Sequence, residues 1–445
     1  MVHQSDLISK DIAAYLGLQE NKDLLRFITC GSVDDGKSTL IGRLLYESRL
    51  VYEDQLASLK VDSKTSGTQG EDIDLSLLVD GLEAEREQGI TIDVAYRFFS
   101  TDRRKFIVAD TPGHEQYTRN MATGASTADV AILLIDAQKG VLVQTRRHGF
   151  IVSMLGVKKV LLAVNKMDLV DYSQEVFEKI ESDFRSFANT ALNLEEVQAV
   201  PVSALKGENV TRPGKKTPWY SGPTLMHYLE TVQVRKALDR LPFRMPVQWV
   251  NRPSPDFRGF AGQVSSGVLK AGDSIKVLPS GRESRVERIV AYQEDLELAV
   301  SGQSVVVTLA DEVDVSRGDV LVASENPCTV ADQFRARILW MDDAPMLPGR
   351  SYLLKIGAQQ VSVTPGKPKH KINVNSLDLE PCRTLGLNEI GVCNIALDQE
   401  IPFDPYDENR AMGGFIMIDR VTNNTVGMGM LDFALRRASN IHWQA

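Results

Sequence analysis

The sequence predicts a multidomain protein in which an α/β P-loop domain is followed by two all-β barrel domains. Three observations support this prediction. A glycine-rich loop at residues 31–38 stands between a predicted strand and a predicted helix. Strands then alternate with helical patterns up to about residue 235, which is typical of a parallel sheet covered by helices. Beyond that point, short alternating strands and turns rich in glycine, proline, aspartate and serine indicate barrels.

The strands expected in the first domain are near-continuous runs of β-branched and aliphatic residues, at 25–30, 105–109, 130–135, 160–164 and 198–201. In such a sheet the functional groups follow the carboxyl ends of the strands. A turn-rich loop at 213–225 precedes the last helix of this domain. The expected limits are a lead-in at 1–23, the α/β domain at 24–238, barrels at 239–327 and 328–437, and a tail at 438–445.

The loop at 31–38 fits the pattern G-x-x-x-x-G-K-[ST] of phosphate-binding loops. Its glycines let the backbone turn its N–H groups toward a phosphate, and the following helix adds a partial positive charge. We expect Lys37 to reach the β- and γ-phosphates and the Ser38 hydroxyl to bind Mg²⁺. The alternative is a glycine-rich turn that binds nothing. The further motifs described below argue against it. The residues expected to contact the nucleotide here are Gly31, Ser32, Val33, Asp34, Asp35, Gly36, Lys37, Ser38 and Thr39.

A second motif, Asp-Thr-Pro-Gly-His, follows the strand at 105–109. The Asp110 carboxylate would hold Mg²⁺, and Gly113 could turn its N–H toward the γ-phosphate. His114 is the candidate that orients the attacking water, so it and Lys37 are the expected catalytic residues. Upstream, Thr91 is the candidate second Mg²⁺ ligand, in a segment ordered by the γ-phosphate. Each of these has a structural alternative. The Asp-Thr-Pro-Gly-His motif could be a surface turn, His114 could be a structural histidine, and the segment with Thr91 could be the start of a strand.

A third motif, Asn-Lys-Met-Asp, follows the strand at 160–164 and selects the base. The Asp168 carboxylate can accept hydrogen bonds from guanine N1–H and N2–H₂, a pair of donors that adenine lacks. Asn165 would bond the purine or brace the phosphate loop, and the stem of Lys166 would cover the base. GTP and Mg²⁺ are therefore the expected ligands. A backbone N–H for guanine O6 is expected, on a weaker signal, from Ser203, Ala204 and Leu205.

The bulk properties restrict the remaining possibilities. The chain has 445 residues, 43% of them apolar and 24% charged, and a formal net charge of −9. This charge argues against a general nucleic-acid binder, whose affinity comes largely from neutralising phosphates. Four cysteines lie far apart and favour reduced thiols. No apolar stretch suits a signal peptide or a membrane span, so we expect a cytoplasmic protein with no membrane contact.

With these motifs in this order and two β-domains behind them, the chain resembles the elongation-factor-like translational GTPases. The stretch at 83–93 is similar to the first switch of that group, and Val33 and Ile90 occupy the positions of an aliphatic pair that gates water. The phosphate loop departs from that group. Elongation factors typically have histidines flanking the Val-Asp pair, whereas this chain has Ser32 and Asp35.

A closer resemblance is carried by the stretches 77–101, 109–126, 144–148, 277–286, 314–321, 387–391 and 415–430. On these stretches the chain resembles the GTPase subunits of bacterial sulfate adenylyltransferase. That resemblance implies GTP hydrolysis that drives ATP and sulfate to adenosine 5′-phosphosulfate and diphosphate in sulfate assimilation. It also implies a smaller catalytic subunit that binds ATP and sulfate, in a heterodimer or a higher assembly of heterodimers. The end of the chain looks like the junction that precedes an adenylylsulfate kinase domain in fused members, which favours a fragment of a bifunctional polypeptide over the alternative of an ordinary tail.

Two other functions stay open at this point. A translational GTPase that delivers aminoacyl-tRNA shares the architecture, and the basic run at 367–371 favours it, although such runs are usually solvated loops. A regulatory GTPase without a metabolic partner fits the first domain equally well. It leaves the stretches in the β-domains unexplained. The resemblance and the charge favour the metabolic function, with no nucleic-acid partner.

Overall fold

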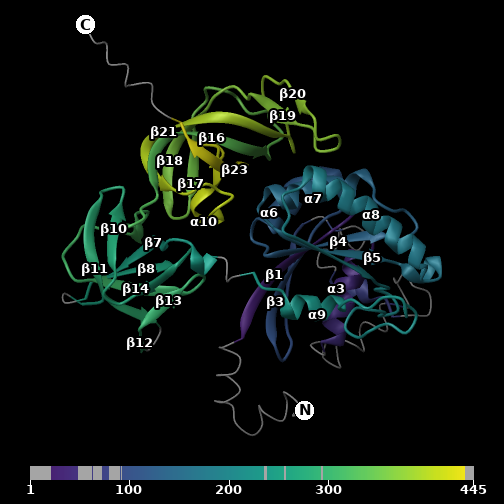
Figure 1. The fold of residues 1–445 in the computed structure, drawn as a ribbon. Coiled ribbons are helices and arrows are strands. Elements are labelled where there is room, and N and C mark those ends of the chain that lie inside the picture. The colour runs from purple at the N-terminus through teal and green to yellow at the C-terminus, as the bar shows by residue number, and fades with distance from the viewer. Residues whose placement is uncertain are drawn as a thin grey trace. The chain divides into compact units, whose positions relative to one another are not determined.

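The computed structural model describes residues 22–48, 63, 73–79, 91, 93–234, 238–254, 257–291 and 294–435. The chain forms two compact units, Met1–Val232 and Gln233–Ala445 (Figure 1). The expected lead-in up to residue 21, residues 83–90 and 92 of the expected first switch, and the expected tail at 438–445 lie outside the described residues. The domain limits given above stay predictions.

A six-stranded sheet in the order β2-β3-β1-β4-β5-β6 forms the centre of the first unit. All neighbouring strands pair in parallel except β2 and β3, which are antiparallel. The five parallel strands confirm the predicted ones within two residues at each end. In chain order the strands are β1 (Asp23–Cys30), β2 (Ala95–Ser100), β3 (Arg104–Asp110), β4 (Val130–Asp136), β5 (Lys159–Asn165) and β6 (Glu196–Pro201).

Helices cover both faces of this sheet, as the sequence predicts (Figure 1). In that view α6, α7 and α8 lie on one side, and α3 and α9 lie on the other. The turn-rich loop at 213–225 precedes α9, as expected. The helices are α3 (Lys37–Glu47), α6 (Thr118–Ser126), α7 (Val143–Met154), α8 (Gln174–Ala191) and α9 (Leu225–Thr231), with 3₁₀ turns η1 (Leu75–Leu78), η2 (Glu115–Tyr117) and η3 (Met167–Val170).

The local sequence accounts for these elements. Strand β4 reads VAILLID and is buried at every position, as expected for a central strand covered on both faces. Helix α8 buries Phe177, Ile180, Phe184 and Ala188, which recur at the spacing of one helical face. The Ser173 hydroxyl accepts a hydrogen bond from the first turn of α8 and so fixes where that helix begins.

The antiparallel edge strand β2 was not predicted. Its sequence AYRFFS places only Phe99 in the core, whereas Phe98 is 68% exposed and Tyr96 is 40% exposed. Exposed aromatic side chains hide the alternation of apolar and polar residues by which a half-buried strand is recognised.

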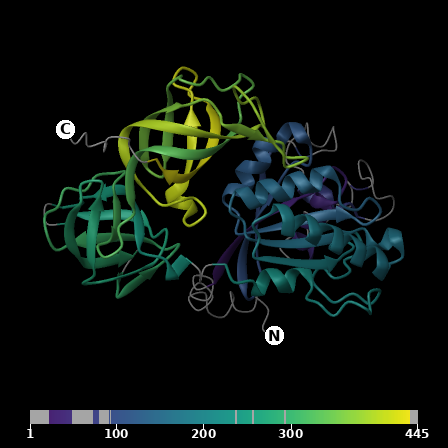
Figure 2. The ribbon, with the colours of Figure 1, turned by 45° about the horizontal axis from the view of Figure 1, so that its top comes forward.

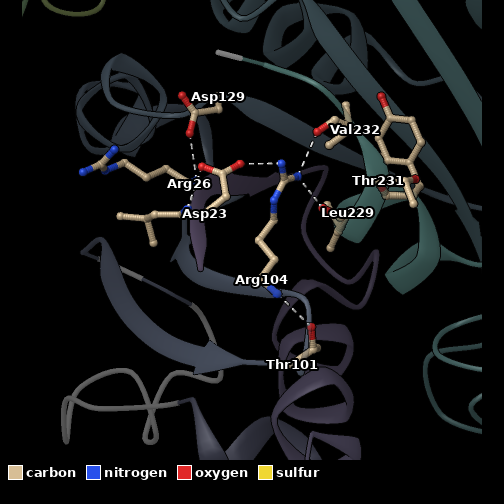
Figure 3. A network of polar contacts seen from close by, with 10 residues as sticks. Asp23, Arg26, Thr101, Arg104, Asp129, Leu229, Thr231 and Val232 are labelled. Atoms are coloured by element: carbon tan, nitrogen blue, oxygen red, sulfur yellow. Dashed lines mark hydrogen bonds and ion pairs between the residues drawn. The ribbon is translucent and has the colours of Figure 1, made fainter. Parts of the chain in front are cut away.

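A buried arginine ties the last helix of the unit to the amino ends of the first strands (Figure 3). Arg104 Nη1 donates to Leu229 O at 2.9 Å and to Val232 O at 2.8 Å, the carbonyl groups at the end of α9. Its Nη2 pairs with the Asp23 carboxylate at 2.6 Å. The guanidinium thus satisfies terminal carbonyl groups that no helical N–H reaches. This network lies at the sheet edge opposite the phosphate loop.

The second unit contains two closed β-barrels, which confirms the predicted fold class (Figure 2). In the first barrel the order is β10-β15-β7-β8-β14-β11, and β10 pairs with β11 to close the ring. Its core includes Met245, Phe260 and Val307. Its strands and their short extensions are β7 (Arg244–Asn251), β8 (Gly259–Gln263), β9 (Val268–Lys270), β10 (Ser274–Leu278), β11 (Arg282–Ala291), β12 (Glu294–Leu296), β13 (Leu298–Val300), β14 (Ser304–Leu309) and β15 (Val320–Ala323).

The second barrel has the order β16-β23-β22-β17-β18-β21, closed by pairing of β16 with β21. Trp340 and Tyr352 pack edge to face in its core, with ring centroids 5.6 Å apart. Arg244 of the first barrel pairs with Asp404 of the second at 3.0 Å. The elements are β16 (Thr329–Trp340), β17 (Tyr352–Ile356), β18 (Gln359–Pro365), β19 (His370–Ile372), β20 (Leu379–Glu380), β21 (Ile390–Phe403), α10 (Arg410–Gly413), β22 (Gly414–Ile418) and β23 (Thr425–Ala434).

Two further expectations concern the whole chain. All four cysteines are free thiols, and three of them are buried. Burial raises the pKa of Cys30 to about 12, so this thiol stays protonated and unreactive. Within the described residues, every helix is too short or too polar to cross a lipid bilayer.

Candidate nucleotide-binding site

The predicted motifs meet at one edge of the first sheet. Gly31 follows β1, Asp110 ends β3, Asn165 ends β5, and Ser203 comes two residues after β6. These strands are parallel, so their carboxyl ends lie at the same edge. The arrangement is the one expected for a ligand that binds beyond the carboxyl ends of a parallel sheet.

The phosphate loop leads directly into α3. Gly36 is the N-cap residue of this helix, with a φ of +90°, and no side chain caps the first turn. A Cβ at this position would lie 2.5 Å from Asn165 Nδ2, so glycine is required by both conformation and space. No capping side chain occupies the N–H groups of the first turn of α3, and uncapped N–H groups at the start of a helix can bind an anion.

Lys37 is buried beneath this loop. Its Nζ donates to Ser32 O at 2.8 Å and to Gly31 O at 3.3 Å. Burial lowers the pKa of Lys37, while the nearby Asp110 and Asp35 carboxylates act in the opposite direction. The ammonium group therefore rests on two loop carbonyl groups, from which it could turn toward a phosphate.

Ser38 and Asp110 lie next to each other, as the motif predicts for Mg²⁺ ligands. Ser38 Oγ donates to Asp110 Oδ2 at 3.1 Å, and Thr29 Oγ1 donates to Asp110 Oδ1 at 3.1 Å. Burial raises the pKa of Asp110, and the Lys37 charge opposes this shift. A hydroxyl beside a carboxylate offers the hard oxygen ligands that Mg²⁺ prefers, so these side chains fit the ion. Thr91 is half-buried, and its neighbours Ile90 and Ile92 lie outside the described residues.

Gly113 presses against the phosphate loop. A Cβ on this residue would lie 2.7 Å from Lys37 Nζ and 2.9 Å from Val33 N. Any side chain at position 113 would therefore force the two loops apart. The Gly113 carbonyl also accepts a hydrogen bond from Gln144 Nε2 at 3.0 Å. The loop after β3 and the phosphate loop are thus in close contact at Gly113, where a side chain would not fit.

His114 follows Gly113, and its imidazole is exposed to solvent. The ring packs edge to face with Tyr117, with centroids 6.1 Å apart. Its Nδ1 accepts a long hydrogen bond of 3.5 Å from Gln116 N. Among the described residues, the contacts of the His114 ring come from its own turn, and the ring is exposed to water.

Asn165 joins three parts of the site. Its Nδ2 donates to Asp35 O in the phosphate loop at 2.8 Å, and its Oδ1 accepts from Ala204 N at 2.9 Å. Arg43 on α3 donates through Nε to Ala204 O at 2.9 Å and also bonds Leu205 O. Of the two tasks expected of Asn165, bracing the phosphate loop is the one seen in these contacts.

The second residue of the base motif is strained. Lys166 has a φ of +62°, and its Nζ forms an ion pair with Asp136 Oδ2 at 2.9 Å. Asp136 ends β4 and is buried. This pair fixes the Lys166 stem across the site. Asp168 is half-buried in η3, two residues further on.

Two residues of α7 for which the sequence predicted no role lie beside the phosphate loop. His148 is buried, and its Nδ1 accepts a hydrogen bond from Gly31 N at 3.1 Å. Its Nε2 lies 3.3 Å from Gln144 Nε2, the group that bonds Gly113 O. Burial lowers the pKa of His148 to about 3, with smaller effects of the Lys37 and Arg147 charges. The spacing of Gln144 and His148, four residues apart on one helical face, was the available signal.

Asp35 is one of the residues expected to contact the nucleotide, but the sequence did not predict that its carboxylate is buried and bonded inside the phosphate loop. Asp35 Oδ2 accepts a hydrogen bond from Ser32 N at 2.5 Å. Its Oδ1 has no hydrogen-bond partner among the described residues, and burial raises the pKa of Asp35. The residue that replaces the histidine of elongation factors thus closes the loop on itself through a side-chain contact.

Comparison with known proteins identifies the family. Residues 22–246 match the Elongation factor Tu GTP binding domain, and residues 333–432 match the GTP-eEF1A C-terminal domain-like family. The chain is 58% identical over 431 residues to the bifunctional enzyme NodQ of a Rhizobium species, covering 97% of this chain and 67% of NodQ. It is 55% identical over 435 residues to the bifunctional enzyme CysN/CysC of Xylella fastidiosa, covering 98% of this chain and 70% of that protein.

A third relative matches over nearly its full length. The sulfate adenylyltransferase subunit 1 of Aeromonas salmonicida is 56% identical over 428 residues, which cover 96% of this chain and 91% of that protein. Family membership rests on this identity and on the GTP-binding domain match. The chain belongs to the sulfate adenylyltransferase subunit 1 family and carries a GTP-binding domain of the elongation factor Tu type.

Proposed function

We propose that this chain is the GTP-hydrolysing subunit of a sulfate adenylyltransferase in sulfate assimilation. In this function, GTP hydrolysis drives the reaction of ATP and sulfate to adenosine 5′-phosphosulfate and diphosphate. The observation that carries the proposal is the convergence of all described nucleotide motifs on one sheet edge, in a chain whose relatives bear that name. The proposed location is the cytoplasm, where ATP and GTP are available.

The phosphate groups of GTP would bind at the start of α3. The loop N–H groups from Gly31 to Thr39 and the Lys37 ammonium would contact them. Asp168 would accept hydrogen bonds from guanine N1–H and N2–H₂, and the backbone at 203–205 would meet guanine O6. The carboxylate needs two donors once it is desolvated, and adenine does not supply them, so the site should reject ATP.

Hydrolysis would depend on groups that meet the γ-phosphate. When bound, Mg²⁺ neutralises the phosphate charge, and its protein ligands would be Ser38, Asp110 and Thr91. Gly113 lies against the phosphate loop and would offer its N–H to the γ-phosphate. The exposed His114 ring would rotate in to orient the attacking water. Loss of the γ-phosphate then removes what holds this loop and the first switch.

The adenylylation itself would belong to a partner. The anhydride of sulfate and AMP is so high in energy that the equilibrium lies far toward ATP. GTP hydrolysis shifts it only when the two nucleotide states make different contacts with the catalytic subunit. We propose that this subunit is smaller and binds ATP and sulfate, and that the two chains form a heterodimer or a higher assembly of heterodimers. The sequence contains one nucleotide-binding loop of the P-loop type.

The proposal is tested by reconstituting the complex with its co-purifying subunit. The readout is adenosine 5′-phosphosulfate formed per minute with and without GTP. Lys37→Ala should abolish the increase caused by GTP, because the γ-phosphate loses its ammonium partner. Lys179→Ala, an exposed substitution on α8, serves as the matched control and should retain it. Full stimulation by GTP in the Lys37→Ala complex would rule out coupling through this site.

A further inference from the structure

We propose that Arg43 is a positioning residue for guanine recognition, because its side chain fixes the backbone that would meet guanine O6. The inference rests on the guanine site proposed above and adds to it a side chain that no nucleotide motif contains. Arg43 lies on α3, the helix that begins with Lys37 at the phosphate loop. It contacts the loop at 203–208, which follows β6.

The Arg43 guanidinium binds two consecutive carbonyl groups of this loop. Nε donates to Ala204 O at 2.9 Å, and Nη2 donates to Leu205 O. The Arg43 side chain is 17% exposed, so water has little access to these bonds. A planar guanidinium presents several N–H donors in a fixed geometry, whereas a lysine ammonium is a point charge on a flexible stem. The guanidinium therefore fixes the orientation of two neighbouring peptide groups against α3.

Glu47, one turn further along α3, holds the guanidinium in this position. Its Oε1 pairs with Arg43 Nη1 at 3.7 Å, and its Oε2 accepts a hydrogen bond from the Thr211 hydroxyl. Gly207 has a φ of +79°, and a Cβ there would lie 2.9 Å from Glu47 Oε1. The loop thus lies so close to α3 that a side chain at position 207 would displace Glu47.

Fixing the carbonyl groups also fixes the N–H groups of the loop. In a trans peptide, the C=O of one residue and the N–H of the next point in opposite directions. Arg43 binds Ala204 O, so it directs the Leu205 N–H away from the guanidinium. Of the three residues expected to meet guanine O6, Ser203 and Ala204 already donate their N–H groups to protein acceptors. The Leu205 N–H has no hydrogen-bond partner among the described residues, so it is the donor available to guanine O6.

The two edges of the base would then be bound by separate parts of the chain. Asp168 lies in η3, after β5, and would bond N1–H and the exocyclic amino group. Leu205 lies after β6 and would bond O6 in the orientation that Arg43 fixes. Loss of the guanidinium lets the peptide group between Ala204 and Leu205 turn. The bond to O6 should therefore weaken, while the bonds to Asp168 remain.

The experiment compares GTP with two analogues that each change one position of the base. 6-Thio-GTP carries sulfur, a weaker acceptor, in place of O6, and ITP lacks the amino group. Titration calorimetry with Mg²⁺ measures the dissociation constants of all three nucleotides for wild type and for Arg43→Met, which keeps an unbranched side chain that favours helix. Loss of one neutral hydrogen bond should lower the ratio Kd(6-thio-GTP)/Kd(GTP) by about fivefold and leave Kd(ITP)/Kd(GTP) unchanged.

Arg185→Met on α8 is the matched control. Arg185 also pairs with a glutamate one turn away, Glu181, and its Nη2 donates to the Val197 carbonyl group at 2.8 Å. Both ratios in this variant should equal those of wild type. An unchanged 6-thio-GTP ratio in Arg43→Met, or an equal fall of both ratios, would overturn the inference, because Arg43 would then act on α3 or on the whole base site without selecting O6.

A second variant keeps the charge at position 43. Arg43→Lys retains the ion pair with Glu47 but lacks the planar group that binds two carbonyl groups, so it should lower the 6-thio-GTP ratio by at least about twofold. A wild-type ratio in this variant would overturn the inference, as would a wild type that binds 6-thio-GTP and GTP equally. A wild type that does not bind GTP, or that prefers ATP, would instead refute the guanine site itself.

Discussion

Asn165 Nδ2 donates to Asp35 O across 2.8 Å and so connects the residue that opens the base motif to the phosphate loop. The same side chain accepts from Ala204 N at 2.9 Å through Oδ1. One amide therefore fixes the relative positions of the three segments from which a nucleotide site would be built. Loss of the Asn165 side chain should therefore affect both the phosphate loop and the segment that contains Ala204.

Asn165→Ala should lower the free energy of unfolding by about 2–3 kcal/mol, since two buried hydrogen bonds are lost. It should also weaken GTP binding. Asn209→Ala is the matched control, because Asn209 is buried and makes comparable bonds to Pro201 O, Thr217 Oγ1 and Gly214 N. We expect a similar loss of stability in the control, measured by urea unfolding, with GTP affinity retained. Equal loss of GTP affinity in both variants would show that Asn165 acts on stability alone.

Asp168→Asn should change the base that the site prefers. An asparagine amide donates where the carboxylate accepts, and xanthine carries a carbonyl group where guanine carries its amino group. The variant should prefer XTP over GTP, with the ratio of affinities shifted by about 100-fold or more. Competition binding of labelled GTP against XTP measures this ratio. Retained preference for GTP would contradict the role proposed for Asp168.

His114→Ala should slow GTP hydrolysis by about 100-fold and leave GTP affinity nearly intact. The reason is that the exposed imidazole makes no described hydrogen bond to the phosphate loop. Single-turnover hydrolysis and equilibrium binding are measured on the same preparation. A parallel loss of both quantities would make His114 a structural residue.

His148→Gln should alter the pH dependence of stability. The folded chain holds the pKa of His148 at about 3, against 6.5 for the unperturbed group. Below pH 6.5 the unfolded chain therefore binds a proton that the folded chain excludes, and stability falls as the pH drops toward 3. The variant should lose this contribution, whose slope is at most about 1.4 kcal/mol per pH unit.

Urea unfolding at several pH values between 7 and 4 measures that slope. His227→Gln is the control, because the His227 side chain is exposed on α9. The same slope in His148→Gln and in wild type would mean that the imidazole takes up its proton in the folded state. Its hydrogen bond with Gly31 N would then be lost on acidification.

Much of the fold follows from short stretches of sequence. The run VAILLID predicts β4 because a strand buried on both faces needs apolar side chains at every position. The phosphate-loop pattern around Gly36 predicts the turn into α3. The structure shows why glycine is needed there, since its φ is positive and a Cβ would lie too close to Asn165. The alternation of apolar and polar residues in short strands, together with the turn residues between them, predicts the barrels. Their closure through β10–β11 and β16–β21 does not, because it depends on pairing between strands far apart in the chain.

The residues that the sequence did not predict act through tertiary contacts. His148 looks like any buried histidine until α7 packs beside the phosphate loop and brings Nδ1 to Gly31 N. The ion pair between Asp136 and Lys166 forms because β4 and β5 lie side by side, and this pairing of strands cannot be read from either residue alone. The basic run at 367–371 shows the converse, because Lys371 pairs with Glu389 at 2.6 Å and its charge is neutralised.

The central claim is that the site at the carboxyl edge of the first sheet binds guanine nucleotides and excludes ATP. Titration calorimetry of the purified chain with GTP, GDP and ATP in the presence of Mg²⁺ tests it most directly. We expect saturable binding of GTP and GDP with one nucleotide per chain, abolished by Lys37→Ala, and no measurable binding of ATP. Absence of heat with GTP and GDP, or tighter binding of ATP, would contradict it.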